Sequence, residues 1–247
     1  MRADYQTGGR GRHGRLWEAP AGENLTVSYL LGGVGLYPDR MFVLAQNVAL
    51  AVRACVERLL GEAGGEARRP PGRRPADPAR ATCAVKWPND VFVGDRKACG
   101  ILLENTVHEG RVSFTIAGIG VNVNEVDRER YPHATSLRAE AQAPFAIERV
   151  WRELTGELET RHRHLRQAVR RGDTYEVHRE YHAHLYGYGH LLQFDDLRGG
   201  GTFAATLKGV TPLGQLRLGR DGGENLYALD DVRQIGRVGR GADSSGR

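Results

Sequence analysis

Disulfide frameworks, paired metal-binding cysteines and long apolar runs are all missing from this sequence of 247 residues. The only cysteines are Cys55, Cys83 and Cys99, and no two of them have CxxC spacing, so we expect neither disulfides nor a zinc site. No apolar run approaches the ~18 residues of a membrane-spanning helix. The first 15 residues lack the apolar core of a secretory signal. We therefore expect a cytoplasmic protein with no membrane partner.

Lysine is also scarce, since only three of the 35 basic residues are lysines: Lys86, Lys97 and Lys208. Codon bias explains most of this imbalance. Lysine is nevertheless a compact point charge and arginine a planar fork, so the two are not interchangeable in a tight site. The formal net charge of +5 is only mildly basic, which argues against a dedicated nucleic-acid-binding protein.

Hydrophobic periodicity predicts a mixture of helices and strands. The expected strands are residues 24–31, 82–87, 91–93, 99–108 and 111–119, and the expected helices are residues 41–60, 146–170 and 173–185. Asp39 is expected to cap the first helix, and Glu109-Gly110 to form a hairpin turn. After residue 190, four short runs (LLQF, TFAATLKGV, QLRLG and NLYALDDV) predict a small β-barrel or sandwich.

Residues 8–15 (GGRGRHGR), closely followed by Trp17, form the first candidate site. Glycines allow close backbone approach and offer N–H donors to an anion, and the arginines add charge-assisted hydrogen bonds. Trp17 could stack on a planar ring. This pattern suits a small anionic ligand with a flat group. A loose RNA-binding Gly/Arg segment is an equally good interpretation of these residues alone.

The second candidate is KWPND, residues 86–90. Lys86 ends an apolar strand, Pro88 stops the strand from continuing, and Asn89 and Asp90 favour a turn. A lysine held at the mouth of a sheet could neutralise a carboxylate and a phosphate together. On these residues alone, a solvated lysine at an ordinary turn is the more favoured interpretation.

Two further segments are weaker signals. In GIGVNVNE, residues 118–125, Gly118 and Gly120 leave space for close packing, and Asn122 can donate and accept as an adenine edge requires. A strand of small residues packed under a helix explains the same pattern. In residues 95–104, Lys97 could reach a phosphate. Of the histidines, His178 and His182 are four residues apart, but a solvated helix face is favoured over a metal site.

The chain resembles the biotin–protein ligase (biotin–[acetyl-CoA-carboxylase] ligase) family, without its N-terminal DNA-binding domain. Three segments in combination carry this resemblance: GRGRHGRLW, KWPNDVFVGDRKACGILLE and AGIGVNVNE. The resemblance extends over essentially the whole chain. It implies an α/β (α+β) fold with a class-II-synthetase-like catalytic domain containing a mixed sheet, followed by a small SH3-like β-barrel.

The resemblance also implies a two-step reaction. The biotin carboxylate attacks the α-phosphate of ATP, bound with Mg²⁺, to give biotinyl-5′-AMP and pyrophosphate. A lysine of a biotin carboxyl carrier protein then attacks the mixed anhydride. No DNA partner is implied, no protein-held metal ligands are assigned, and a homodimer is left open.

Residue roles follow from the same resemblance. The residues expected to act in catalysis are Lys86 and Arg12. Those expected to contact biotin are Gln6, Gly9, Arg10, Gly11, Arg12, Lys86, Gly118 and Gly120. Those expected to contact ATP are Arg12, Arg15, Trp17, Asn89, Lys97 and Asn122.

The expected domains are a ligase domain over residues 1–186, with a disordered insertion at about 61–81, and a barrel over residues 187–236 before a disordered tail at 237–247. The family has a further helix and strand, with a Ser/Thr-bearing biotin-binding segment, ahead of the Arg-rich loop. This chain begins near that loop, so we expect either an earlier start or an incomplete sheet. The alternatives are a lipoate- or octanoate-transferring relative, a degenerate non-catalytic relative and an RNA-binding module.

Overall fold

A six-stranded sheet forms the framework of the computed structural model, which describes residues 1–11, 16–63 and 83–237. Its strand order is β1-β4-β8-β7-β6-β5, and every ladder in it is antiparallel. Isolated parallel bridges join Val85 to Leu185 and Lys97 to Ala134. The strands are β1 (Arg2–Ala3), β4 (Leu25–Gly32), β5 (Cys83–Lys86), β6 (Asp90–Val93), β7 (Arg96–His108) and β8 (Arg111–Val121).

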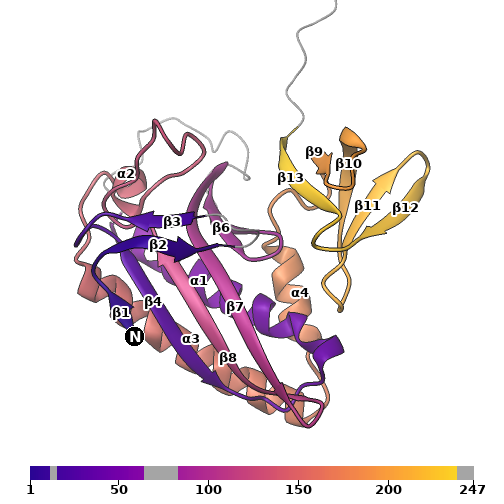
Figure 1. The fold of residues 1–247 in the computed structure, drawn as a ribbon, viewed down its shortest axis with the longest axis horizontal. Helices are drawn as coiled ribbons and strands as arrows, with labels where there is room; N and C mark the ends of the chain where they lie inside the picture. Colours follow the sequence, from indigo (N-terminus) through magenta and orange to yellow (C-terminus); the bar gives the residue numbers. More distant parts are fainter. Residues whose placement is uncertain (12–15, 64–82, 238–247) are drawn as a thin grey trace, which may run out of the picture.

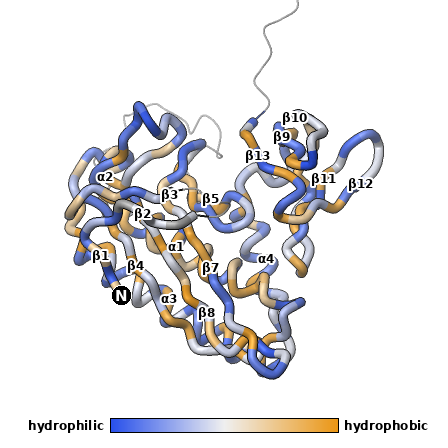
Figure 2. The backbone as a smooth tube through the Cα atoms, viewed as in Figure 1, coloured by the Kyte–Doolittle hydropathy of each residue, from blue (hydrophilic) through white to orange (hydrophobic). Residues whose placement is uncertain are grey.

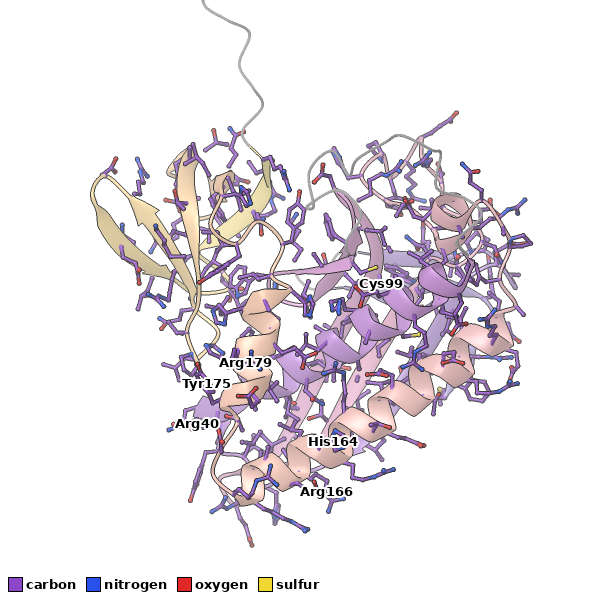
Figure 3. The ribbon with its side chains drawn as sticks, turned by 180° about the vertical axis from the view of Figure 1, so that it is seen from behind. Arg40, Cys99, His164, Arg166, Tyr175 and Arg179 are labelled. Carbon is purple, nitrogen blue, oxygen red and sulfur yellow. The ribbon has the colours of Figure 1, made fainter. Side chains whose placement is uncertain are left out.

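Helices cover one side of this sheet, and a short hairpin near the N-terminus lies on the other side (Figure 1). The long helices are α1 (Phe42–Ala63) and α3 (Ile147–Arg170), and α4 (Tyr175–Ala183) follows α3. The buried residues of α3, Val150, Leu154, Leu158 and Leu165, recur at helical spacing and pack against the sheet. Figure 3 shows α1 and α3 lying across the sheet from behind, with Cys99 beside α1.

The β7–β8 hairpin confirms the expected turn at Glu109-Gly110. His108 pairs with Arg111, which leaves a two-residue loop. Both loop residues have positive φ, 50° at Glu109 and 72° at Gly110, as the favoured hairpin turns require. Long hydrophobic stretches follow β4 and β8 in Figure 2. Buried residues of both strands, among them Leu25 and Ile119, belong to the main hydrophobic core.

The C-terminal part is a second antiparallel sheet of five strands, ordered β12-β11-β10-β9-β13. The strands are β9 (Leu191–Asp196), β10 (Gly201–Val210), β11 (Leu216–Arg220), β12 (Gly223–Tyr227) and β13 (Val232–Arg237). Within the described residues, no ladder joins β12 to β13, so the sheet does not close. The α+β architecture is therefore present.

Several local expectations were wrong or incomplete. Residues 225–232 were expected as one strand. They instead contain the end of β12 and the start of β13, and these two strands lie at opposite edges of the sheet. The Gly/Arg-rich start contains a hairpin of β2 (Gln6–Arg10) and β3 (Leu16–Ala19). Asp39 does not cap α1, because it lies inside a short 3-10 helix, Pro38–Arg40. A small helix, α2 (Leu137–Ala141), was missed, although Ser136 Oγ accepts from Ala139 N–H as an N-cap.

The histidines of α4 are not on a solvated face. His182 Nε2 accepts a hydrogen bond from Val210 N–H at 2.9 Å, and its Nδ1 lies 2.8 Å from His178 O. His178 Nδ1 lies 2.8 Å from Gln46 Nε2 on α1. These two histidines therefore connect α4 to α1 and to β10.

The expected insertion and tail lie mostly outside the described residues. Of residues 61–81, the first three complete α1, and the remainder are not described. Arg237 ends β13, and residues 238–247 are not described. No helix in the described ranges is long and apolar enough to cross a membrane.

Candidate active site

A cavity of about 970 Å³ opens where the β2–β3 hairpin lies over β7 and β8. The β5–β6 turn lines another part of its wall, and β13 of the C-terminal sheet contributes a further part. The cavity collects most of the residues that the motifs identified, although they are up to 116 residues apart, from Gln6 to Asn122.

Lys86 enters this cavity from the end of β5. It pairs with Asp90 across the turn, and the Trp87–Pro88 peptide bond within the turn is cis. Lys86 Nζ lies 4.9 Å from the centre of the Phe92 ring, a cation–π distance. Lys86 is therefore one of the residues that line the cavity. Its chemical role stays a prediction.

The rest of KWPND fixes the turn in place. Trp87 Nε1 donates to Gly214 O at 2.9 Å, which ties the turn to the C-terminal sheet. Asn89 is buried and donates from Nδ2 to Ile101 O on β7 at 2.6 Å. Asp90 accepts from Lys97 Nζ at 2.7 Å, so Lys97 reaches the cavity as half of an ion pair.

The β2–β3 hairpin covers the cavity from the side opposite the helices. Gln6, Gly9 and Gly11 all line it. A Cβ on Gly9 would lie 2.6 Å from Trp17 O and 2.7 Å from Gln6 Cδ, so only glycine fits there. Arg10 belongs to β2. The expected anion-binding residues Arg12 and Arg15 lie outside the described residues.

The Trp17 side chain packs against Gly100 in β7 and Gly120 in β8. A Cβ on Gly120 would lie 2.3 Å from the indole, and one on Gly100 would lie 3.1 Å from it. Gly118 is different, because its nearest neighbour, Leu102 O, would be 3.7 Å away. Gly120 therefore makes room for the protein's own tryptophan, whereas Gly118 leaves space for a ligand.

Asn122 lies where β8 has just ended and is buried beside the same cavity. Its Nδ2 donates to Thr135 O at 3.0 Å, and its backbone N–H donates to Ala98 O at 2.9 Å. These bonds fix the amide, leaving its oxygen as the group that a ligand could use.

One part of the wall was missed entirely by sequence reasoning. Its residues come from the C-terminal sheet and the loops next to it: Leu197, Leu229, Val232, Arg233 and Gln234. No motif marks them, and they follow Lys86 by more than 100 residues. The alternation of VRQI was the one available signal, because it places Val232 and Gln234 on one side of a strand.

Ionisation within and beneath the site is set mainly by burial. Burial, and then the hydrogen bond to Asp95, raises the pKa of Tyr186 to about 12, so it remains a phenol that donates to Asp95 at 2.8 Å. Burial raises the pKa of Cys55 to about 12 and that of Cys99 well above its usual range. These thiols are therefore inert. Among residues 1–11, 16–63 and 83–237, no cluster of three or more His, Cys, Asp or Glu could hold a metal ion.

Sequence comparison relates the N-terminal half of the chain to known proteins. Residues 2–124 match the Biotin/lipoate A/B protein ligase family. The biotin–[acetyl-CoA-carboxylase] ligase of Mycobacterium tuberculosis is 33% identical over 159 residues, which cover 64% of this chain and 52% of that protein. The bifunctional ligase/repressor BirA of Bacillus subtilis is 32% identical over 123 residues, which cover 50% of this chain and 32% of BirA. The chain thus spans a third to a half of these relatives' lengths.

Structural comparison extends the similarity to nearly the whole fold. The biotin protein ligase from Aquifex aeolicus, solved in complex with biotin and ATP, superposes with a TM-score of 0.67. That match covers 94% of this chain and 88% of the other, at 22% sequence identity. The biotin protein ligase from Leishmania major in complex with biotinyl-5-AMP matches with a TM-score of 0.55 at 23% identity. At these identities the similarity concerns the fold.

Proposed function

We propose a biotin–protein ligase activity for this chain, which belongs to the Biotin/lipoate A/B protein ligase family. In this proposal, the protein joins biotin to ATP, bound with Mg²⁺, and forms biotinyl-5′-AMP and pyrophosphate. It then transfers biotin to a lysine of a biotin carboxyl carrier protein. The observation that carries the proposal is the single cavity that brings Lys86 together with Trp17, Lys97 and Asn122.

The first chemical step requires two anions, a carboxylate and a triphosphate, to approach each other. A fixed cation between them offsets their repulsion and stabilises the charge that develops in the transition state. Lys86 is well placed for this role, because strand pairing holds its backbone and the residue lines the cavity. Binding both substrates in one cavity also lowers the entropic cost of their reaction.

The cavity has suitable dimensions and chemistry for both ligands. Its volume of about 970 Å³ lies at the upper end of the range for small-molecule sites, which fits two ligands bound side by side. The open floor at Gly118 suits the apolar tail of biotin. Trp17 and Asn122 together offer a planar surface and an amide for adenine. Lys97, Asn89 and the Arg-rich hairpin would complete the nucleotide side.

Several finer assignments belong to the same proposal. Mg²⁺ would arrive with the ATP rather than be held by a cluster of protein ligands. The open C-terminal sheet would correspond to the SH3-like barrel of the family, and residues 1–186 to its class-II-synthetase-like domain. We place the protein in the cytoplasm, with no DNA or membrane partner.

Biotin-dependent exchange of labelled pyrophosphate into ATP tests the proposal directly. The purified protein is mixed with Mg-ATP, pyrophosphate and either biotin, lipoate or octanoate. Exchange with biotin alone supports the proposal, and exchange with lipoate or octanoate alone supports the other branch of the family. Absence of exchange with all three acids, together with steeply salt-dependent RNA binding, contradicts any ligase activity.

A further inference from the structure

Gln234 carries a buried hydrogen-bond acceptor with no partner at the edge of the cavity. Its side chain is 3% exposed and lines the cavity from β13. Nε2 makes a long contact of 3.5 Å with Tyr186 O, which orients the amide. Oε1 has no hydrogen-bond partner among the described residues. A buried carbonyl oxygen without a donor is costly, so a ligand with an N–H group is the natural partner.

A chain of contacts through Tyr186 and Phe92 connects Gln234 with Lys86. The Gln234 amide touches Tyr186, the Tyr186 ring lies 5.3 Å from the Phe92 ring, and Lys86 Nζ lies over Phe92. Trp17, the platform proposed for adenine, instead packs on Gly120 in β8. The N–H donor for Gln234 is therefore expected near the reacting carbonyl and not on the adenine ring.

The wall around Gln234 suits a lysine side chain. Leu197, Leu229 and Val232 line the same end of the cavity and offer an apolar surface to a four-carbon stem. We propose that this corner admits the acceptor lysine of the carrier protein and that Gln234 Oε1 accepts a hydrogen bond from its amine. The inference rests on the proposed ligase activity and adds a residue of the C-terminal sheet to the transfer step.

The transfer chemistry explains why a neutral acceptor fits here. The unprotonated amine nitrogen attacks the carbonyl carbon of biotinyl-5′-AMP and forms a C–N bond. The bond from that carbon to the phosphate oxygen breaks, and AMP leaves with the electron pair. The extra proton on nitrogen passes to water, while Gln234 only orients the N–H group. The cation at Lys86 disfavours a protonated amine, and a carboxylate in place of Gln234 would favour one.

Ionisable groups come to this corner from several elements. Lys86 is on β5, Asp95 follows β6, and Tyr186 follows α4. On β13, Arg233 pairs with Asp195 of β9 at 2.5 Å, and Arg237 lies 3.7 Å from Asp95. These acids are already engaged in ion pairs, whereas Gln234 Oε1 has no hydrogen-bond partner among the described residues.

The test separates activation from transfer in the full-length chain. Wild type, Gln234→Leu, Gln234→Glu and a control, Gln193→Leu on the neighbouring strand β9, are compared. Pyrophosphate exchange measures activation. Single-turnover transfer from preformed biotinyl-5′-AMP is measured with a biotin carboxyl carrier domain and with hydroxylamine, a small nucleophile that does not need a lysine channel.

We expect Gln234→Leu to slow transfer to the carrier domain by about tenfold, with exchange and the hydroxylamine reaction unchanged. Gln234→Glu should move the pH profile of carrier transfer to higher pH, because a carboxylate stabilises the protonated amine. Equal slowing of exchange and transfer, or normal transfer in Gln234→Leu, would overturn this role. Failure of wild type to catalyse exchange would instead overturn the proposed function.

Discussion

Lysines 86 and 97 line the same cavity in different electrostatic settings. Lys97 is paired with Asp90 at 2.7 Å, so much of its charge is offset before any ligand binds. Lys86 Nζ lies 4.9 Å from the centre of the Phe92 ring, a cation–π distance. The proposed function gives the main charge-neutralising role to Lys86 and a supporting role to Lys97, whose amine already has a carboxylate partner.

Replacing Lys86 with alanine should reduce biotin-dependent pyrophosphate exchange by about two to three orders of magnitude, because it removes a fixed charge from the transition state. The melting temperature should change little, since no core volume is lost. Exchange kinetics and thermal melting measure the two effects. Lys208→Ala, at an exposed position of β10, is the matched control. Near-normal exchange in Lys86→Ala would refute the role.

Two glycines on one strand should respond differently to alanine. Gly120→Ala places a methyl group 2.3 Å from the Trp17 ring and should cost about 1–3 kcal/mol through overpacking. It should also raise the KM for ATP, because Trp17 has to move. Gly118→Ala, with its nearest neighbour at 3.7 Å, should leave stability unchanged and raise the KM for biotin. Thermal melts and initial rates compare them, and identical effects would contradict the assignment of Trp17.

At the scale of elements, two histidines of α4 connect this helix to β10 and α1. His182 accepts from the backbone of β10, which requires an unprotonated Nε2. Gly209 in the same strand has a φ of 130°, and a Cβ there would lie 2.7 Å from this nitrogen. His178 meets His182 edge-to-face, with ring centres 4.3 Å apart and an interplanar angle of 74°. Positive charge on both rings at this distance would be repulsive, and the neighbouring His182 helps to lower the pKa of His178.

Stability should consequently depend on pH. Burial, and then the neighbouring His182, lowers the pKa of His178, and burial also lowers the pKa of His162 and His184. The unfolded chain therefore takes up protons first as the pH falls through about 6.5, and the folded state loses stability below that pH. Urea unfolding between pH 7.5 and pH 5 measures this. The His178→Gln variant should show a weaker dependence of the free energy of unfolding on pH, whereas His164→Gln, at an exposed position, should not. An unchanged pH dependence in His178→Gln would contradict the role of His178.

At the scale of the whole molecule, the two sheets share one apolar core. A single cluster of buried residues includes Leu25 and Val52 from the N-terminal part and Leu192, Phe194 and Leu218 from the C-terminal sheet. Trp87 adds a hydrogen bond between the two parts. The division at residue 187 remains a prediction about domains, but the packing predicts energetic coupling between them.

This coupling predicts one cooperative unfolding transition. Calorimetry of the full chain should give a single peak whose calorimetric and van't Hoff enthalpies agree. Trp87→Phe, which keeps most of the apolar volume but loses the bond to Gly214, should lower the midpoint without splitting the peak. Two resolved transitions in the wild type would show that the sheets unfold independently.

The sequence alone determined most of the long elements and all of the motifs. Periodicity located α1, α3 and the β7–β8 hairpin, because burial of one side of a helix or strand is written directly into residue spacing. Lys86 could be assigned to a strand end because proline and turn-forming residues follow it. The short hairpin at the start was missed, since glycines and arginines carry little strand propensity.

Only the tertiary structure decided which residues share the cavity. It packed Trp17 on Gly120, paired Lys97 with Asp90, and brought Gln234 to the end of the cavity that Lys86 lines. These contacts join segments more than 100 residues apart in two of the cases. They depend on how the sheets and the hairpin pack together. The spacing of apolar residues along the sequence cannot predict such packing, because it indicates only which side of each element is buried.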